Sequence, residues 1–93
     1  MEQYTEQYKS VLTALIKKQM VILGPSVAFG TAKKVTTLTI TPDGTVTDIA
    51  GDPVASMKLL AQSYMNLSGQ IAQNTLDSIL QQHPDLVKQS LEG

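Results

Sequence analysis

Residues 35–53, with the sequence VTTLTITPDGTVTDIAGDP, predict a β-hairpin that leads directly into a capped helix. The turn would be residues 41–44 (TPDG), which place Pro at the second position and Gly where a positive φ is needed, as in a type I turn with a G1 bulge. Asp52 then has the place of a helix N-cap, and Pro53 that of the first helical residue. Because a two-stranded hairpin is marginally stable alone, other parts of the chain or a second copy must cover it.

This turn also sets the expected pairing of the two strands. The expected pairs are Ile40 with Val46, Thr39 with Thr47, and Leu38 with Asp48. One face would carry Leu38, Ile40 and Val46, and the other would carry the threonines together with Ile49. We therefore expect a half-buried hairpin with one hydroxyl-bearing face.

Two helices are predicted before the hairpin. Apolar residues recur at three- and four-residue spacing over residues 3–22, and Gly24 followed by Pro25 ends that helix. Because Pro suits the first turn of a helix, a shorter helix is expected over residues 25–34.

After residue 53 the apolar residues form a narrow seam of alternating three- and four-residue spacing, which is typical of helices that pack nearly parallel. At Ser68-Gly69 the apolar positions begin to shift to another face, so we expect a bend or a break there. Pro84 would end the segment, and a short tail helix is expected over residues 85–91. The seam consists of Met57, Leu60, Tyr64, Leu67 and Ile71.

These elements predict a single α+β domain over residues 1–93, with a long N-terminal helix, a short helix, a two-stranded antiparallel hairpin and a long or broken C-terminal helix. A chain of 93 residues buries a modest share of its surface, and only 16% of its residues are charged. We therefore expect a homo-oligomer, with a dimer favoured, in which hairpins extend one another's sheet or the long helices pack together.

No residue pattern indicates an enzyme, a cofactor or a metal. The chain has no Cys, and the sequence places no catalytic partner beside its single histidine, His83. Residues 24–34 (GPSVAFGTAKK) lack the spacing of a phosphate-binding loop. Asp43, Asp48 and Asp52 lack the spacing of a calcium loop.

The preferred hypothesis is a small non-enzymatic oligomerisation or protein-interaction module, for which a regulatory role is one option. Its contacts would come from the helical seam and from the apolar stretch around the Gly24-Pro25 turn. The expected interface residues are Val21, Ile22, Val27, Phe29, Met57, Leu60, Tyr64, Leu67 and Ile71.

Two alternatives stay open. In the first, the Gly24-Pro25 turn, Phe29, Met57 and Tyr64 line a pocket for a small apolar ligand. In the second, a patch of four lysines binds an anionic partner weakly, although a chain without Arg is poorly equipped for nucleic-acid recognition. The patch would be Lys17, Lys18, Lys33 and Lys34.

The sequence favours a cytoplasmic location. Its first residues, MEQY, are acidic and polar, unlike the basic start of a signal peptide. The most apolar stretch, residues 20–30, is too short to cross a bilayer.

Overall fold

The structure, a computed structural model, describes residues 2–84 and 86, and over this range it confirms an α+β fold. The tail helix expected over residues 85–91 lies outside the described residues apart from Leu86, which is buried. The elements are α1 (Glu2–Leu23), α2 (Pro25–Lys33), β1 (Leu38–Ile40), β2 (Val46–Ile49), α3 (Pro53–Ser68) and α4 (Gln70–Gln81).

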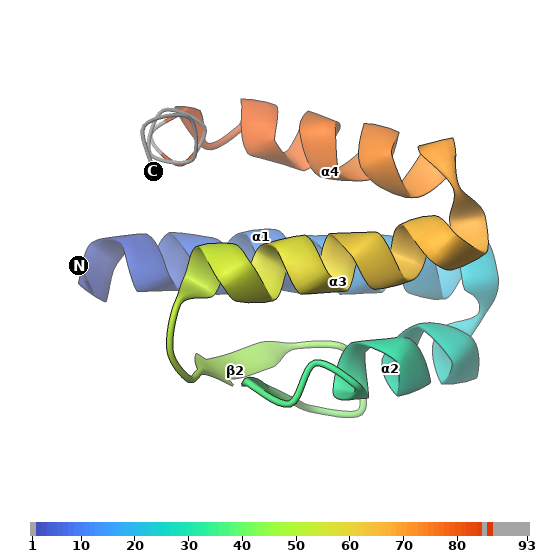
Figure 1. Cartoon of the computed structure of the whole chain (residues 1–93), viewed down its shortest axis with the longest axis horizontal. Helices are drawn as coiled ribbons and strands as arrows, with labels where there is room; N and C mark the ends of the chain where they lie inside the picture. Colours follow the sequence, from blue (N-terminus) through green and yellow to red (C-terminus); the bar gives the residue numbers. More distant parts are fainter. Residues whose placement is uncertain (1, 85, 87–93) are drawn as a thin grey trace.

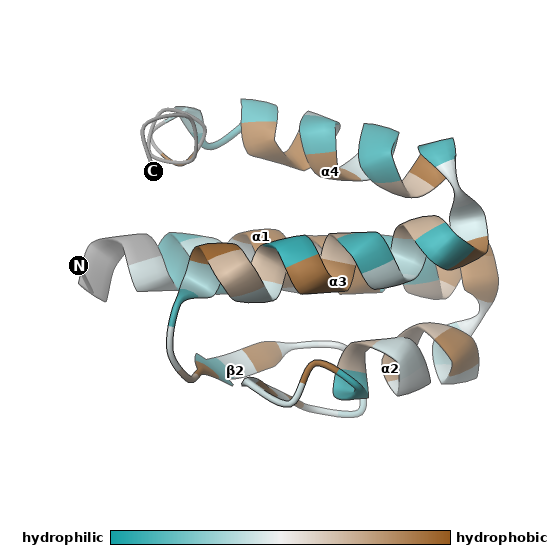
Figure 2. Ribbon diagram, viewed as in Figure 1, coloured by the Kyte–Doolittle hydropathy of each residue, from teal (hydrophilic) through white to brown (hydrophobic). Residues whose placement is uncertain are grey.

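The helices are arranged around α1, which contacts α2, α3, α4 and β2. Figure 1 shows α1 and α3 running in the same direction through the middle of the molecule, with α4 on one side and α2 with the hairpin on the other. The hydrophobic face of α4 points toward this middle layer, and its hydrophilic face points outward (Figure 2). One apolar core therefore includes side chains from all six elements.

Local chemistry explains where α3 begins and ends. Asp52 is the N-cap, and its Oδ1 accepts the backbone N–H of Val54 at 3.0 Å, as the sequence predicted. At the other end Gly69 has a φ of +59°, a conformation that side chains with a Cβ disfavour. The chain reverses there into α4, so the predicted break at Ser68-Gly69 is confirmed.

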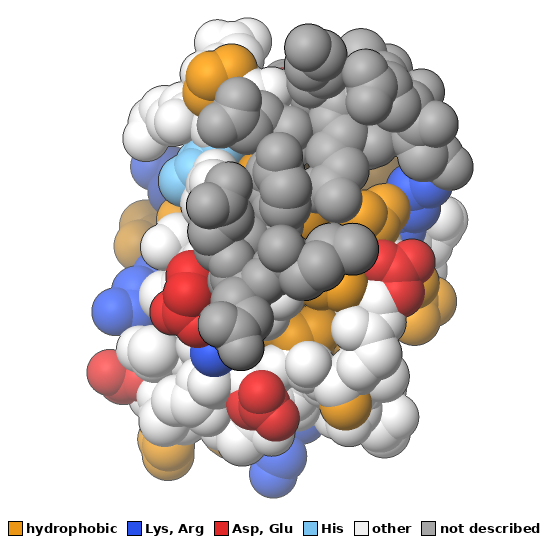
Figure 3. All heavy atoms as spheres, turned by 90° about the vertical axis from the view of Figure 1, so that its left-hand side faces the viewer, with side chains coloured by type: hydrophobic (Ala, Val, Ile, Leu, Met, Phe, Trp, Pro, Cys, Tyr) orange, Lys and Arg blue, Asp and Glu red, His pale blue; other side chains and the backbone are white. Residues whose placement is uncertain are grey.

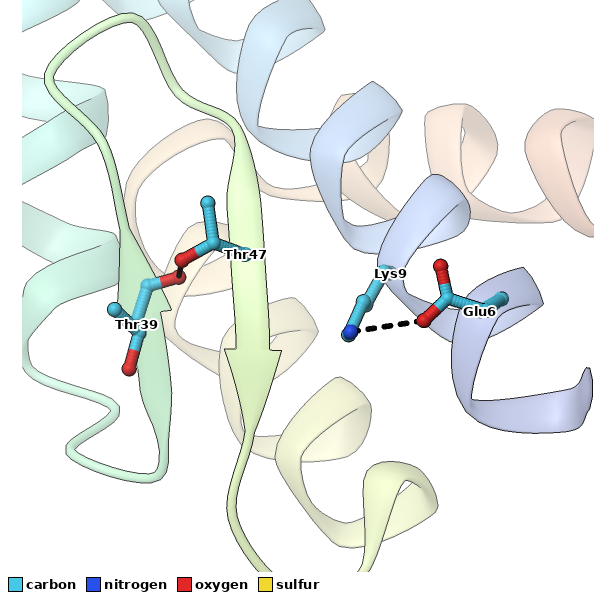
Figure 4. Close-up of polar contacts among 4 residues, drawn as sticks. All are labelled: Glu6, Lys9, Thr39 and Thr47. Carbon is cyan, nitrogen blue, oxygen red and sulfur yellow. Dashed lines mark hydrogen bonds and ion pairs between the residues drawn. The ribbon is translucent and has the colours of Figure 1, made fainter. Parts of the chain in front are cut away.

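The predicted strand register is correct near the turn and wrong beyond it. Ile40 pairs with Val46, but Thr39 pairs with Asp48 and Leu38 with Ile49, because the pairing shifts by one residue between Thr39 and Ile40. Thr47 is the additional residue of a β-bulge, and its hydroxyl donates to the Thr39 carbonyl at 3.3 Å (Figure 4). The bulge places Val46 and Ile49, three residues apart, on the same buried face, with Thr47 and Asp48 exposed between them.

The apolar face of the hairpin is covered by the helices of the same chain. Leu38, Val46 and Ile49 belong to the shared core. The turn packs on α1 so closely that a Cβ on Gly44 would lie 3.0 Å from the Met20 sulfur. A second copy is therefore not needed to cover this hairpin, which removes one of the reasons for expecting a dimer.

Candidate interaction surface

Two sharp helix-to-helix turns lie at the same end of the molecule. Gly24 joins α1 to α2 and Gly69 joins α3 to α4, and Figure 1 shows both connections at the right-hand end. The hydroxyl of Ser68, beside the second turn, donates a hydrogen bond to Gln19 Oε1 in α1 at 3.0 Å. The two turns are thus held side by side by a direct bond between α1 and α3.

Exposed aliphatic side chains gather around these turns. In the described part of the chain, five large hydrophobic side chains are exposed, and four of them lie within three residues of Gly24 or Gly69. We call these four residues the end patch. They are Val21 (79% exposed), Val27 (49%), Leu67 (52%) and Ile71 (53%).

The end patch lies in the least charged part of the sequence. All seven Lys and all eight Asp and Glu residues fall outside residues 19–32 and 59–76, the two stretches that contain the turns. The opposite end of the molecule is different, because Figure 3 shows acidic and basic side chains interspersed with hydrophobic ones there. Depletion of charge around exposed apolar side chains is characteristic of the centre of protein–protein interfaces.

The end patch has a rigid support. The Tyr64 hydroxyl, carried by α3, donates a buried hydrogen bond to the Ala28 carbonyl of α2 at 2.7 Å. Burial of this side chain raises the pKa of Tyr64, which keeps the hydroxyl protonated and able to donate. Because α1 is bonded to α3 and α3 to α2, the helices that carry Val21, Val27 and Leu67 are joined to one another.

The structure divides the interface residues predicted from the sequence. Met57, Leu60 and Tyr64, the first part of the seam, are at most 4% exposed and belong to the core of this chain. Ile22 and Phe29 are half-buried. The remaining four predicted residues are those of the end patch. Two of them, Leu67 and Ile71, are the last residues of the seam and flank the break at Gly69.

The pocket predicted around Phe29, Met57 and Tyr64 is not assembled as expected. Tyr64 is completely buried, and its hydroxyl is bonded to Ala28. Met57 instead lines a groove of about 350 Å³ between α3 and α4, with Met65 and Leu76.

Residues of α1 and residues 45–47 of the hairpin line a groove of about 540 Å³. Lys9 points into the space between the two elements, and its Nζ bonds Glu6 Oε2 at 2.9 Å (Figure 4). This hydrogen bond is the main reason that the pKa of Lys9 is raised. The hydroxyl oxygen of Thr13, in the same groove, accepts a hydrogen bond from the backbone N–H of Val46 at 3.0 Å. This N–H of β2 is therefore not free to pair with another strand.

A second groove, of about 520 Å³, runs between α1 and α4. Its lining includes Ala14 and Lys18 from α1 and Ile71 and Ile79 from α4. Ile71 also belongs to the end patch, so the groove, which Lys18 helps to line, adjoins the patch. The groove could not be predicted from the sequence, because the residues of α1 and α4 that line it are more than 50 positions apart in the chain.

The four lysines of the predicted anionic-partner patch are all exposed. Lys17 and Lys18 lie on α1, whereas Lys33 and Lys34 lie at the end of α2. Lys33 Nζ is 5.4 Å from the centre of the Phe29 ring, a cation–π contact one helical turn away. The pKa of Asp43 is lowered by hydrogen bonds from Thr41 and Thr45 and, to a smaller extent, by Lys17.

The chain has no match among family models, curated proteins or solved structures. Within the described residues, no three His, Asp or Glu side chains are grouped so that they could hold a metal ion. None of the helices in that part of the chain is long and apolar enough to cross a membrane. The end patch is therefore the feature on which a functional proposal rests.

Proposed function

We propose that this protein is a small non-enzymatic interaction module that binds another protein surface through the end patch. The observation that carries the proposal is that four exposed aliphatic side chains lie near two turns at the same end of the molecule. The stretches that contain these turns, residues 19–32 and 59–76, have no charged residue. Single exposed hydrophobic residues are normal on any protein, whereas exposed hydrophobic residues gathered near one end of a molecule favour an interaction site.

The geometry supports recognition rather than chemistry. The patch offers aliphatic surface carried by fixed helices, and the polar residues beside it, such as Asn66 and Gln70, are exposed amides without charge. Burial of such a surface against a partner is driven by removal of apolar area from water and requires no reacting group.

The chain provides a matched control for this proposal. Leu59 is 57% exposed, compared with 52% for Leu67, and both residues lie on α3. Their separation of eight positions corresponds to about 12 Å along the helix, so Leu59 lies outside the end patch.

The experiment is photo-crosslinking in cells from a photoreactive amino acid placed at position 67 or at position 59. We expect a discrete protein adduct from position 67 and none from position 59, because only the former lies in the proposed contact. Excess purified wild-type protein added to a lysate should suppress the adduct, whereas excess Leu67→Gln protein should not. Equal adducts from both positions, or no adduct from position 67, would show that the end patch is not the binding surface.

A further inference from the structure

We propose that Asp43 is a site of spontaneous conversion to isoaspartate, and that the folded hairpin keeps this site unreactive. The site is independent of the end patch. Asp43-Gly44 is the only Asp-Gly pair in the sequence, which contains no Asn-Gly pair. Because glycine has no side chain, its backbone nitrogen approaches the carboxyl carbon of a preceding aspartate with the least steric hindrance. The turn therefore contains the dipeptide at which this reaction is fastest in an unfolded chain.

The reaction needs no reagent other than water. The Gly44 backbone nitrogen loses its proton and forms a bond to Cγ of Asp43, while a C–O bond of the protonated carboxyl breaks and water leaves. Water then opens the resulting cyclic succinimide. Where it breaks the bond between the Gly44 nitrogen and the main-chain carbonyl carbon of Asp43, the product is isoaspartate, and the main chain runs through Cβ and Cγ.

The nucleophile of this reaction, the Gly44 nitrogen, is held inside the turn. Its N–H donates to the Thr41 carbonyl at 2.9 Å, and Gly44 is buried. Loss of an amide proton to solvent is also the chemical step of hydrogen exchange, and a bonded, buried amide exchanges only when the structure around it opens. Attack by this nitrogen therefore requires the turn to open first.

The electrophile, the Asp43 carboxyl group, is exposed but is held in its charged form. Its Oδ1 accepts hydrogen bonds from the Thr41 hydroxyl and from the backbone N–H of Thr45, the latter at 3.1 Å. These bonds stabilise the carboxylate and lower the pKa of Asp43, which reduces the amount of protonated carboxyl from which water can leave. Both reacting groups are thus restrained by the same turn.

The product does not fit the folded turn. Gly44 lies so close to α1 that a Cβ on it would be 3.0 Å from the Met20 sulfur and 3.1 Å from Cγ2 of Ile16. Isoaspartate adds one main-chain atom directly before Gly44, inside the loop that the Thr41 N–H closes by donating to the Thr45 carbonyl at 2.9 Å. The longer loop cannot keep both this bond and the contact with α1, so the modified hairpin should close less stably.

The test measures the rate of isoaspartate formation at position 43 in the folded full-length protein and in the same protein unfolded in guanidinium chloride, at equal pH and temperature. Proteolysis followed by electron-transfer dissociation mass spectrometry identifies the product. We expect the folded protein to react at least about tenfold more slowly, because the reaction follows the population of the open turn. Equal rates in the two states would overturn the proposal.

Two variants separate the turn bonds from the rest of the hairpin. Thr41→Val removes the hydroxyl that bonds Asp43, whereas Thr47→Val removes a hydroxyl that bonds the Thr39 carbonyl. We expect Thr41→Val to react faster than wild type when folded and at the wild-type rate when unfolded, and Thr47→Val to match wild type in both states. A folded Thr41→Val protein that reacts no faster than Thr47→Val would refute protection by these bonds.

Two measurements on the wild type decide the matter even where a variant does not fold. Hydrogen exchange of the Gly44 N–H should be slowed by folding at least about tenfold, as the modification is, and rapid exchange in the folded protein would contradict the proposed protection. Protein purified with isoaspartate at position 43 should unfold at a lower denaturant concentration than unmodified protein. An unchanged midpoint would show that the turn accommodates the longer main chain.

Discussion

The hydrogen bond between Tyr64 and Ala28 allows a prediction that is independent of any partner. In Tyr64→Phe the ring keeps its place in the core, but the 2.7 Å bond from the hydroxyl to the Ala28 carbonyl is lost. Ala28 lies inside α2, where its carbonyl also accepts the N–H four residues on, so the variant leaves no buried group without a partner. We expect a loss of about 1 kcal/mol in the free energy of unfolding, and a fall of about 4–8 °C in Tm.

The same residue makes this difference depend on pH. Burial raises the pKa of Tyr64 above its ordinary value of 10.0, so above that pH the unfolded chain loses a proton that the folded chain retains. Its contribution is therefore fully present below pH 10 and declines as the pH rises further. At pH 11 the wild type should have lost about 1.4 kcal/mol that Tyr64→Phe cannot lose, so the two stabilities should cross between about pH 10.5 and 11.

The assay is urea unfolding followed by far-ultraviolet circular dichroism, for wild type and Tyr64→Phe, at pH 8 and at intervals to pH 11. The other titrating groups are present in both proteins, so the difference between the two curves isolates Tyr64. A pH-independent difference would refute the argument that the Tyr64 side chain resists ionisation in the folded state. Equal stability at pH 8 would show that the bond to Ala28 contributes nothing net.

Four further substitutions test the local structure by the same unfolding measurement. Asp52→Ala should destabilise the protein by about 1 kcal/mol through loss of the α3 cap, and an unchanged stability would contradict that role. Gly69→Ala should cost about 1–2 kcal/mol because φ is positive there, whereas Gly30→Ala, inside α2 with open space around it, should stabilise by about 0.5–1 kcal/mol. Gln19→Met should stabilise the protein by about 1 kcal/mol, because the buried Nε2 of Gln19 has no hydrogen-bond partner among the described residues. A loss of stability would show that the bond from Ser68 to Gln19 Oε1 contributes more than the unpaired Nε2 costs.

Much of the fold could be predicted from the sequence because it depends on contacts between near neighbours in the chain. The helix ends at Gly24-Pro25, the cap at Asp52 and the break at Ser68-Gly69 are set by backbone dihedral preferences and short-range hydrogen bonds. The strand register was predictable only as far as Ile40 and Val46. Beyond them the core requires both Val46 and Ile49, and the alternation of an ideal strand cannot bury two residues that are three apart.

The candidate surface was only partly predictable for a related reason. Periodicity grouped Met57, Leu60, Tyr64, Leu67 and Ile71 into one seam, because it measures angles around a single straight helix. It could not show that the reversal at Gly69 leaves Leu67 and Ile71 exposed while the others enter the core. The absence of charge from residues 19–32 and 59–76 was a usable signal, but its meaning depends on the two stretches being neighbours in space.

The sequence by itself determined the elements of this protein: where helices start and stop, where the chain turns, and that its class is α+β. These features follow from φ preferences, capping groups and apolar spacing, which act within a few residues. Only the tertiary structure decided that the hairpin is covered within the chain, that a bulge shifts its register, and that the turns at Gly24 and Gly69 lie at the same end of the molecule. The physical reason is that burial is a property of the whole packed chain, since the same aliphatic side chain is core or surface according to what distant segments place against it.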